Sequence, residues 1–109
     1  MELEQLRVFL AAAEAGGFSP AARALYVSRS TVSRTVAALE RELGTALFVR
    51  SNRTQALTEA GRVLADEARG LLLQAERVKR TLAAYKSEQA GTGAADFLPR
   101  PPQIVYTKI

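Results

Sequence analysis

The sequence predicts a mainly α-helical protein that carries one small β hairpin and continues into a long helix. Three observations predict this class. Apolar residues recur every three or four positions over most of the first 43 residues, as on one face of a helix. A short segment near residues 47–57, with β-branched and aromatic residues, breaks that pattern. From residue 59 the spacing of three and four returns and is kept to about residue 88.

The first helix is expected to begin near Leu3 and to end at the glycine pair Gly16-Gly17. Glycine readily forms the left-handed turn that ends a helix, so the pair is a natural stop. The apolar side of this helix is formed by Leu3, Leu6, Phe9, Leu10 and Ala13.

The second helix is predicted to be short, from about Pro20 to Tyr26. A serine N-cap followed by proline in the first helical position is a strong start signal, and Ser19-Pro20 match it. The residues expected to face inward are Ala21, Ala22 and Leu25. The small alanines would let a neighbouring helix approach closely.

The third helix, predicted from Ser28 to Leu43, carries two different faces. Its apolar face comprises Val32, Val36, Leu39 and Leu43. Its opposite face is small, polar and basic, with Ser30, Ser33, Arg34 and Ala37. Ser28 is predicted to be the N-cap and Gly44 the left-handed C-terminal cap. Such a helix suits insertion into a DNA major groove, although an ordinary amphipathic surface helix would show the same pattern.

The second and third helices are joined by the brief turn Val27-Ser28, so together they form a helix-turn-helix unit. After it, residues 47–49 are expected to form a strand and residues 55–57 its partner. Between the strands lies Arg50-Ser51-Asn52-Arg53, which predicts a hairpin wing with two arginines at its tip. A solvated turn would fit the same residues. Beside a helix-turn-helix, however, such arginines more often contact phosphate or enter a minor groove.

The fourth helix is predicted from Glu59 to about Glu88, with Thr58 as its cap. The capping box is incomplete, because its third position is Gly61. The apolar residues recur in steps of four and three, as in a coiled-coil seam. They are Leu64, Ala68, Leu71, Ala75, Val78, Leu82 and Tyr85. A small domain cannot cover so long a seam, so the expected partner is the same helix of a second copy; packing against its own domain is the alternative.

Charge is distributed unevenly along the 109 residues, which carry a net charge of +4. No Asp or Glu occurs from Ala15 to Leu39 or from Leu43 to Thr58, while arginines lie in both windows. This favours a polyanionic partner. The chain has no His and no Cys. Their absence excludes disulfides, thiolate nucleophiles, the usual zinc ligands and a Ser–His–Asp triad, so neither an enzyme nor a metal or cofactor site is expected.

No apolar run approaches the roughly 20 residues that a transmembrane helix needs. Met1 is followed directly by Glu2 and Glu4, unlike a secretory signal peptide. We therefore expect a cytoplasmic protein without a membrane partner. Glycines and prolines within residues 89–109 predict a flexible tail.

In this order and spacing, the elements resemble the N-terminal winged helix-turn-helix of LysR-type transcriptional regulators. The resemblance covers Leu3 to about Tyr85. It is carried by Ala21-Ala22, the run VSRSTVSRTVAALERELG, LF-x-R in the wing and Leu57-Thr58-Glu59-Ala60-Gly61. The predicted organisation is a DNA-binding domain over 1–58, with the helix-turn-helix at about 18–37 and the wing at about 47–57, then a dimerisation helix over 59–88 and the tail.

The resemblance implies a homodimer that binds interrupted inverted repeats of double-stranded DNA near promoters. The third helix would enter the major groove, the wing would contact the minor groove or the backbone, and the fourth helix would pair two subunits. The DNA-binding residues carried over are Ser28, Arg29, Ser30, Thr31, Ser33, Arg34, Arg50 and Arg53. Many members carry Gln in place of Arg29. Because Arg commonly reads guanine and Gln adenine, a changed base preference is expected.

Typical members continue into a sensor of two α/β subdomains that binds a small molecule. The residues up to Ile109 do not clearly resemble the start of that sensor, so no effector binding is expected of this chain. Two alternatives remain open at this point. The chain could be a short form or fragment that acts by occupying sites or by forming mixed dimers with longer relatives. It could also be a protein-interaction module that uses the heptad helix.

Overall fold

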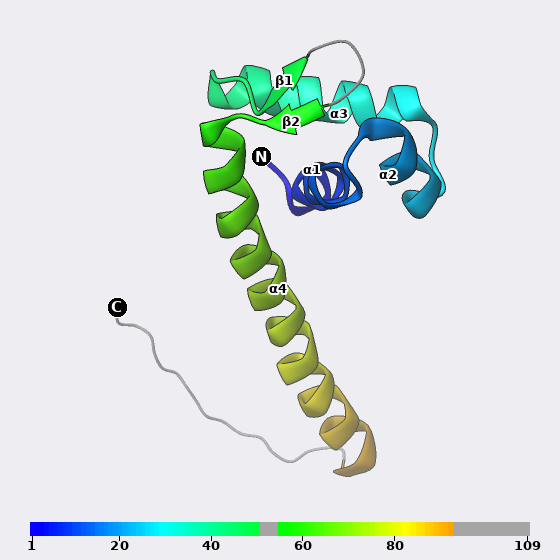
Figure 1. Cartoon of the computed structure of the whole chain (residues 1–109). Coiled ribbons are helices and arrows are strands. Elements are labelled where there is room, and N and C mark those ends of the chain that lie inside the picture. The colour runs from blue at the N-terminus through cyan, green and yellow to red at the C-terminus, as the bar shows by residue number, and fades with distance from the viewer. Residues whose placement is uncertain (51–54, 93–109) are drawn as a thin grey trace. The chain divides into compact units, whose positions relative to one another are not determined.

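The computed structural model describes residues 1–50 and 55–92, with side chains described as far as residue 86. Within these residues it confirms the predicted class of four helices and a two-stranded antiparallel hairpin (Figure 1). The elements are α1 (Leu3–Ala15), α2 (Phe18–Leu25), α3 (Arg29–Leu43), β1 (Phe48–Arg50), β2 (Gln55–Leu57) and α4 (Glu59–Thr92). Among the helices described, none is both long and apolar enough to span a bilayer.

The core lies where α1, α2 and α3 pack against one another and against the hairpin. Three phenylalanines form its centre. The ring of Phe48 makes edge-on contacts with Phe9, at 5.6 Å between centroids, and with Phe18, at 5.3 Å. Each such pair contributes about 0.5–1.5 kcal/mol beyond the burial of its area. Phe48 therefore fastens β1 to α1 and α2 at once.

The buried side of α1 is broader than the predicted stripe. Leu6 and Phe9 are buried as expected, but Leu3 is 43% exposed. Val8 and Ala12, outside the predicted stripe, are buried as well. The reason is that α2 and α3 both pack on α1, so more than one narrow face of this helix is covered.

The start of α2 differs from the prediction. The helix begins at Phe18 with Gly17 as its N-cap, so Ser19 lies inside the first turn and is not the cap. The backbone N–H of Phe18 instead donates to the Gln55 side-chain oxygen at 3.0 Å. This acceptor comes from β2, and it satisfies one of the N–H groups that a helix start leaves without an intrahelical partner. The helix ends at Leu25. Tyr26 follows in the left-handed conformation, with φ 61°, and is 95% exposed.

Both predicted caps of α3 are confirmed. The Ser28 hydroxyl accepts from the Thr31 N–H at 3.1 Å, and Gly44 ends the helix with φ 72°. The predicted apolar face is also confirmed for three of its four residues. Val32, Val36 and Leu39 are fully buried, whereas Leu43 is 40% exposed.

The two serines offer a direct test of these cap assignments. We expect Ser28→Ala to lower the free energy of unfolding by about 1 kcal/mol, because the Thr31 N–H loses its acceptor. Ser19→Ala should change it by less than about 0.5 kcal/mol, because Ser19 is exposed and caps no helix. Urea unfolding of both variants measures the difference. Equal losses would contradict the cap assignments.

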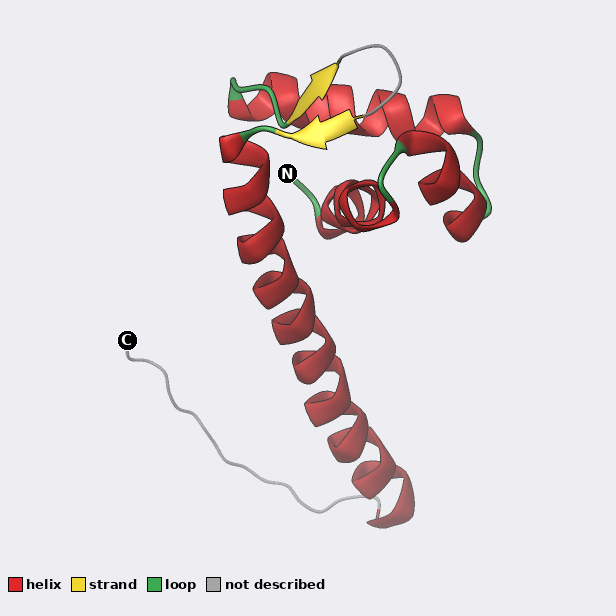
Figure 2. Cartoon of the chain, in the orientation of Figure 1, coloured by secondary structure: helices red, strands yellow, loops and turns green. Residues whose placement is uncertain are grey.

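The hairpin lies beside α3, with cross-strand partners Phe48↔Leu57, Val49↔Ala56 and Arg50↔Gln55 (Figure 2). Its second strand leads directly into α4. The predicted cap Thr58 is confirmed, since its hydroxyl oxygen accepts from the Gly61 N–H at 2.9 Å. The same hydroxyl donates to the Ala46 carbonyl oxygen at 2.7 Å, which joins the two ends of the hairpin.

The first turns of α4 complete the core. Ala65 and Ala68 are buried, and the first of the two compact units of the chain comprises Met1–Gln74. An ion pair from Arg69 to Glu14, at 3.2 Å, links this part of α4 to α1. The helix itself continues to Thr92, past the predicted end at Glu88.

Candidate nucleic-acid interface

The first turn of α3 presents a cluster of hydroxyl groups and an arginine to the outside. Ser28, Arg29 and Ser30 are exposed, and Thr31 is half-buried. The Ser28 hydroxyl lies 3.1 Å from that of Ser30 and 2.9 Å from that of Thr31. Hydroxyl groups both donate and accept hydrogen bonds, and a helix N-terminus attracts negative charge. With no acidic residue in this turn, the cluster suits a polyanion that also offers polar edges.

Further along α3, the predicted separation of faces is present. Arg34 is exposed and Ser33 is half-buried, while Val32 before them and Val36 after them are fully buried. The buried pair fixes the rotation of the helix about its axis. Arg34 therefore projects from the same exposed side of the helix as Ser30, one turn further on.

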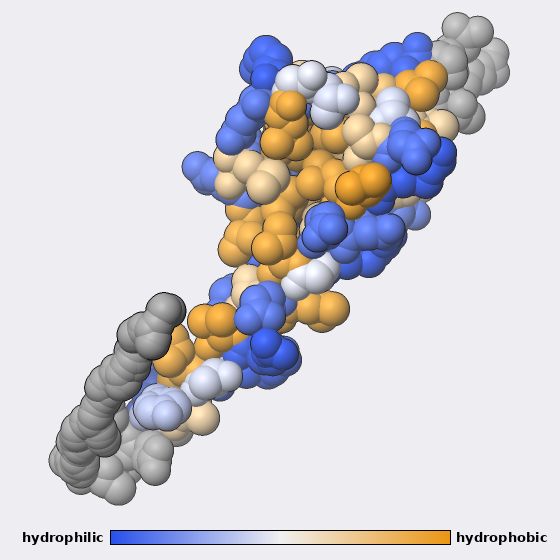
Figure 3. Space-filling view, turned by 90° about the vertical axis from the view of Figure 1, so that its left-hand side faces the viewer, coloured by the Kyte–Doolittle hydropathy of each residue, from blue (hydrophilic) through white to orange (hydrophobic). Residues whose placement is uncertain are grey.

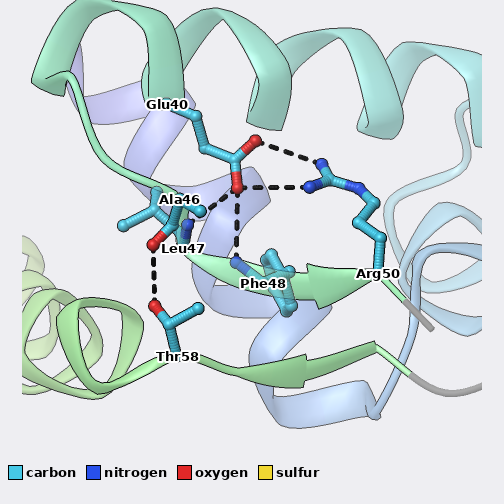
Figure 4. Close-up of polar contacts among 6 residues, drawn as sticks. All are labelled: Glu40, Ala46, Leu47, Phe48, Arg50 and Thr58. Atoms are coloured by element: carbon cyan, nitrogen blue, oxygen red, sulfur yellow. Dashed lines mark hydrogen bonds and ion pairs between the residues drawn. The ribbon is translucent and has the colours of Figure 1, made fainter.

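Glu40, on α3, holds the start of the hairpin in place. One of its carboxylate oxygens accepts from the backbone N–H groups of Leu47, at 2.7 Å, and Phe48, at 3.2 Å. The Arg50 guanidinium donates to both oxygens, at 3.2 and 3.4 Å (Figure 4). Sequence reasoning did not single out Glu40 as a site residue. The available signal was its position as one of two acids, with Glu42, between two acid-free windows.

Arg50 does not lie at the tip of the wing as predicted. It is the last residue of β1, and its charge is paired with Glu40. Its guanidinium carbon also lies 5.6 Å from the centre of the Phe18 ring. The guanidinium of Arg29 approaches the same ring at 5.7 Å. The other predicted wing arginine, Arg53, lies outside the described residues.

The surroundings of Glu40 favour its charged form. Burial by itself would raise the pKa of the carboxyl, but hydrogen bonds from the Leu47 amide, the Arg50 guanidinium and the Phe48 amide outweigh it. The pKa of Glu40 therefore lies below its ordinary value of 4.5. Because the pKa is lower in the folded state, the resulting stabilisation is complete above that ordinary value. It is lost as the pH falls through the folded-state pKa.

We expect Glu40→Gln to lower the free energy of unfolding by about 2 kcal/mol at neutral pH, since the acceptor loses the charge that strengthens its hydrogen bonds and pairs with Arg50. The gap between the wild type and the variant should narrow as the pH falls below 4.5. Urea unfolding over a pH series measures this. Glu42→Gln, at an exposed carboxylate of the same helix, is the control and should change stability little. A gap that stays constant with pH would contradict the assignment.

The predicted dimerisation seam divides into two parts. Ala68 is fully buried and Leu64 partly buried within this chain, so for these two the alternative of packing against the domain holds. Ala75 is half-buried. The rest of the seam is exposed, namely Leu71 at 44%, Val78 at 49%, Leu82 at 59% and Tyr85 at 63%. Figure 3 shows hydrophobic side chains on the surface of α4 among polar ones.

The chain is similar to known bacterial transcriptional regulators. The model of the bacterial regulatory helix-turn-helix protein, lysR family, matches residues 3–62. The transcriptional regulator TfdT of Cupriavidus pinatubonensis is 43% identical over 91 residues, which are 84% of this chain and 40% of that protein. The transcriptional activator IlvY of Salmonella typhimurium is 49% identical over 82 residues, or 75% of this chain and 28% of that protein. The matched part of the chain thus spans less than half of the length of either relative.

Solved structures of proteins from this family resemble the chain closely. A crystal structure of the CbnR_DBD–DNA complex matches with a TM-score of 0.73 and 43% identity, covering 78% of this chain and 99% of that one. Full-length CbnR complexed with its target DNA matches with a TM-score of 0.74 and 42% identity, covering 77% of this chain and 29% of that one. From the family match and these likenesses, the chain belongs to the lysR family of bacterial regulatory helix-turn-helix proteins.

Proposed function

We propose that this chain is the DNA-binding module of a transcriptional regulator that acts in the cytoplasm. It binds a sequence-specific operator in double-stranded DNA as a homodimer, with α3 in the major groove and the wing beside it. The observation that carries the proposal is the division of α3. Its first turns expose hydroxyl groups and arginines without an acid, and its other side is locked into the core by Val32, Val36 and Leu39. The names of the relatives and the DNA complex of CbnR_DBD support it.

The exposed residues of α3 have different roles in this proposal. Arg29, at the helix start, donates to a base edge, for which guanine is the preferred partner of an arginine. Ser28, Ser30 and Thr31 offer hydroxyl groups to bases and phosphates near that end. Arg34, one turn further on, holds a phosphate, with Ser33 beside it. Since Arg50 is paired with Glu40, its part is to shape the wing rather than to supply a free charge.

The homodimer follows from the exposed part of the α4 seam. Two copies of the helix would cover Leu71, Val78, Leu82 and Tyr85, which a single chain leaves exposed. A two-fold dimer places two α3 helices on one duplex, so the operator is expected to be an inverted repeat. The spacing of its half-sites reports the distance between the two helices.

Selection of bound sites from random DNA, followed by binding of the selected duplex by variants, tests the proposal. We expect Arg34→Ala to weaken binding to all duplexes. The slope of log affinity against log salt concentration should fall by about one phosphate contact per subunit, or about two per dimer. Arg80→Ala removes the same charge from an exposed site on α4 and is the control. If Arg34→Ala and Arg80→Ala behave alike, α3 is not the DNA-binding element. Absence of any salt-sensitive DNA binding by the wild type would instead favour a protein-interaction module that uses α4.

A further inference from the structure

We propose that Phe18 is a positioning residue for Arg29, and that it couples base recognition at the start of α3 to the wing. Phe18 itself would touch no DNA. Its ring would hold the Arg29 guanidinium near the orientation in which it meets a base, and the wing would hold the ring. The inference rests on the proposed function, because it assumes that Arg29 reads a base.

The ring of Phe18 is held in a fixed position. Phe18 is the first residue of α2 and is 2% exposed. The ring of Phe48 meets it edge-on, with an interplanar angle of 90°. A buried ring in a packed core changes its position little, since neighbouring side chains leave no room.

Two guanidinium groups lie over this ring. The guanidinium carbon of Arg29 is 5.7 Å from the ring centre and that of Arg50 is 5.6 Å away. Cations within about 6 Å of an aromatic centre are attracted by the electron-rich face of the ring. The carboxylate of Glu40 offsets the charge of Arg50, which lowers the repulsion that Arg29 would meet there.

The wing reaches Phe18 through both of its strands. Arg50 of β1 contacts the ring, and the Gln55 side chain of β2 accepts from the Phe18 N–H at 3.0 Å. These two residues are cross-strand partners. A single rung of the hairpin therefore holds both the ring and the backbone of Phe18. A change at the base of the wing would therefore shift Phe18, and through Phe18 it would alter the position of Arg29 at the start of α3.

The consequence for recognition concerns the freedom of Arg29. An exposed arginine has many rotamers and loses most of them when it donates two hydrogen bonds to a base. Contact with the ring removes part of that freedom before DNA arrives, so less is lost on binding. A leucine could fill the same core position but would offer no electron-rich face. The inference thus separates a recognition role of Phe18 from its packing role.

A double-mutant cycle tests this on the selected operator. The measured quantity is the base preference at the position that Arg29→Gln relaxes, expressed as the ratio of affinities for the selected and the substituted base pair. We expect Phe18→Leu to lower that ratio by about two- to fivefold and to leave ratios at other positions unchanged. In the Arg29→Gln background, Phe18→Leu should have no further effect on the ratio. A uniform loss at all positions, equal in both backgrounds, would show that Phe18 only packs and would overturn the inference.

A second measurement covers the case in which Phe18→Leu does not fold. Nitrogen-15 relaxation of the side-chain Nε–H groups in the wild-type protein without DNA compares Arg29 with Arg34, which is exposed on the same helix. We expect a higher order parameter for Arg29, and equal values would overturn the inference.

The outcomes are separable from those of the proposed function. If Arg34→Ala loses DNA binding but Phe18 and Arg29 show no coupling, only the inference about Phe18 is contradicted. If the wild-type protein does not bind DNA, both the inference and the proposed function are contradicted.

Discussion

Replacement of Gly61 by alanine is expected to lower the free energy of unfolding by about 3 kcal/mol, although alanine is normally the better helix former. Gly61 lies in the first turn of α4, where the helix passes directly over the start of the hairpin. A Cβ atom at this position would lie 2.2 Å from the Leu47 carbonyl oxygen and 2.9 Å from a methyl carbon of Leu57. The closer of the two contacts is with backbone, so the whole hairpin start would have to move.

Gly70, in the same helix, is the matched control. A Cβ there would meet nothing within 4 Å. Gly70→Ala should therefore raise the free energy of unfolding by about 0.5–1 kcal/mol, as expected from helix propensity alone. Thermal or urea unfolding of the two variants would show opposite signs. A Gly61→Ala protein as stable as the wild type would mean that α4 does not approach Leu47 as closely as described.

The second large effect is expected from Leu82→Asp. Leu82 is 59% exposed in the single chain and lies in the part of the seam assigned to a second copy. A carboxylate there would be buried without a partner charge in the contact with the second copy, so the dimer should dissociate. Affinity for a duplex with two half-sites should then fall on the order of 10²-fold, because the second half-site is no longer tethered to the first. Affinity for a single half-site should stay the same.

Thr81→Asp adds the same charge at the neighbouring exposed position, outside the seam, and should leave the dimer intact. Sedimentation equilibrium gives the mass of each variant, and circular dichroism checks that α4 remains helical. A Leu82→Asp protein that still sediments as a dimer would show that this part of α4 is not the contact. A wild type that is monomeric at every concentration would remove the homodimer from the proposal.

Local signals explain why α3 was predicted well. Its cap Ser28, its stop Gly44 and the spacing of Val32, Val36 and Leu39 all lie within the helix or next to it. Each acts through neighbours a few residues away, and such signals can be read from a sequence. The same holds for Thr58, whose hydroxyl serves the first turn of α4.

The predictions that were wrong concern residues whose partners are distant in the sequence. Ser19 was predicted as the cap of α2, but the helix begins before it, at Phe18, whose N–H donates to Gln55 on the wing. Arg50 was placed at the wing tip because nothing in its neighbours revealed the pairing with Glu40 on α3. For Gly61 the sequence showed a gap in a capping box and a match to the family run, but it did not show the nearby Leu47 carbonyl oxygen that leaves no room for a side chain. These pairings depend on how elements pack, which no local pattern contains.

The anchoring of the hairpin on Glu40 has a consequence for how this domain can assemble. Strands of three residues do not persist alone in water, and two backbone donors at the start of this hairpin find their acceptor on α3. The hairpin therefore depends on α3 for its stability. Local unfolding of α3 would remove the Glu40 acceptor, so the wing would lose its structure as well.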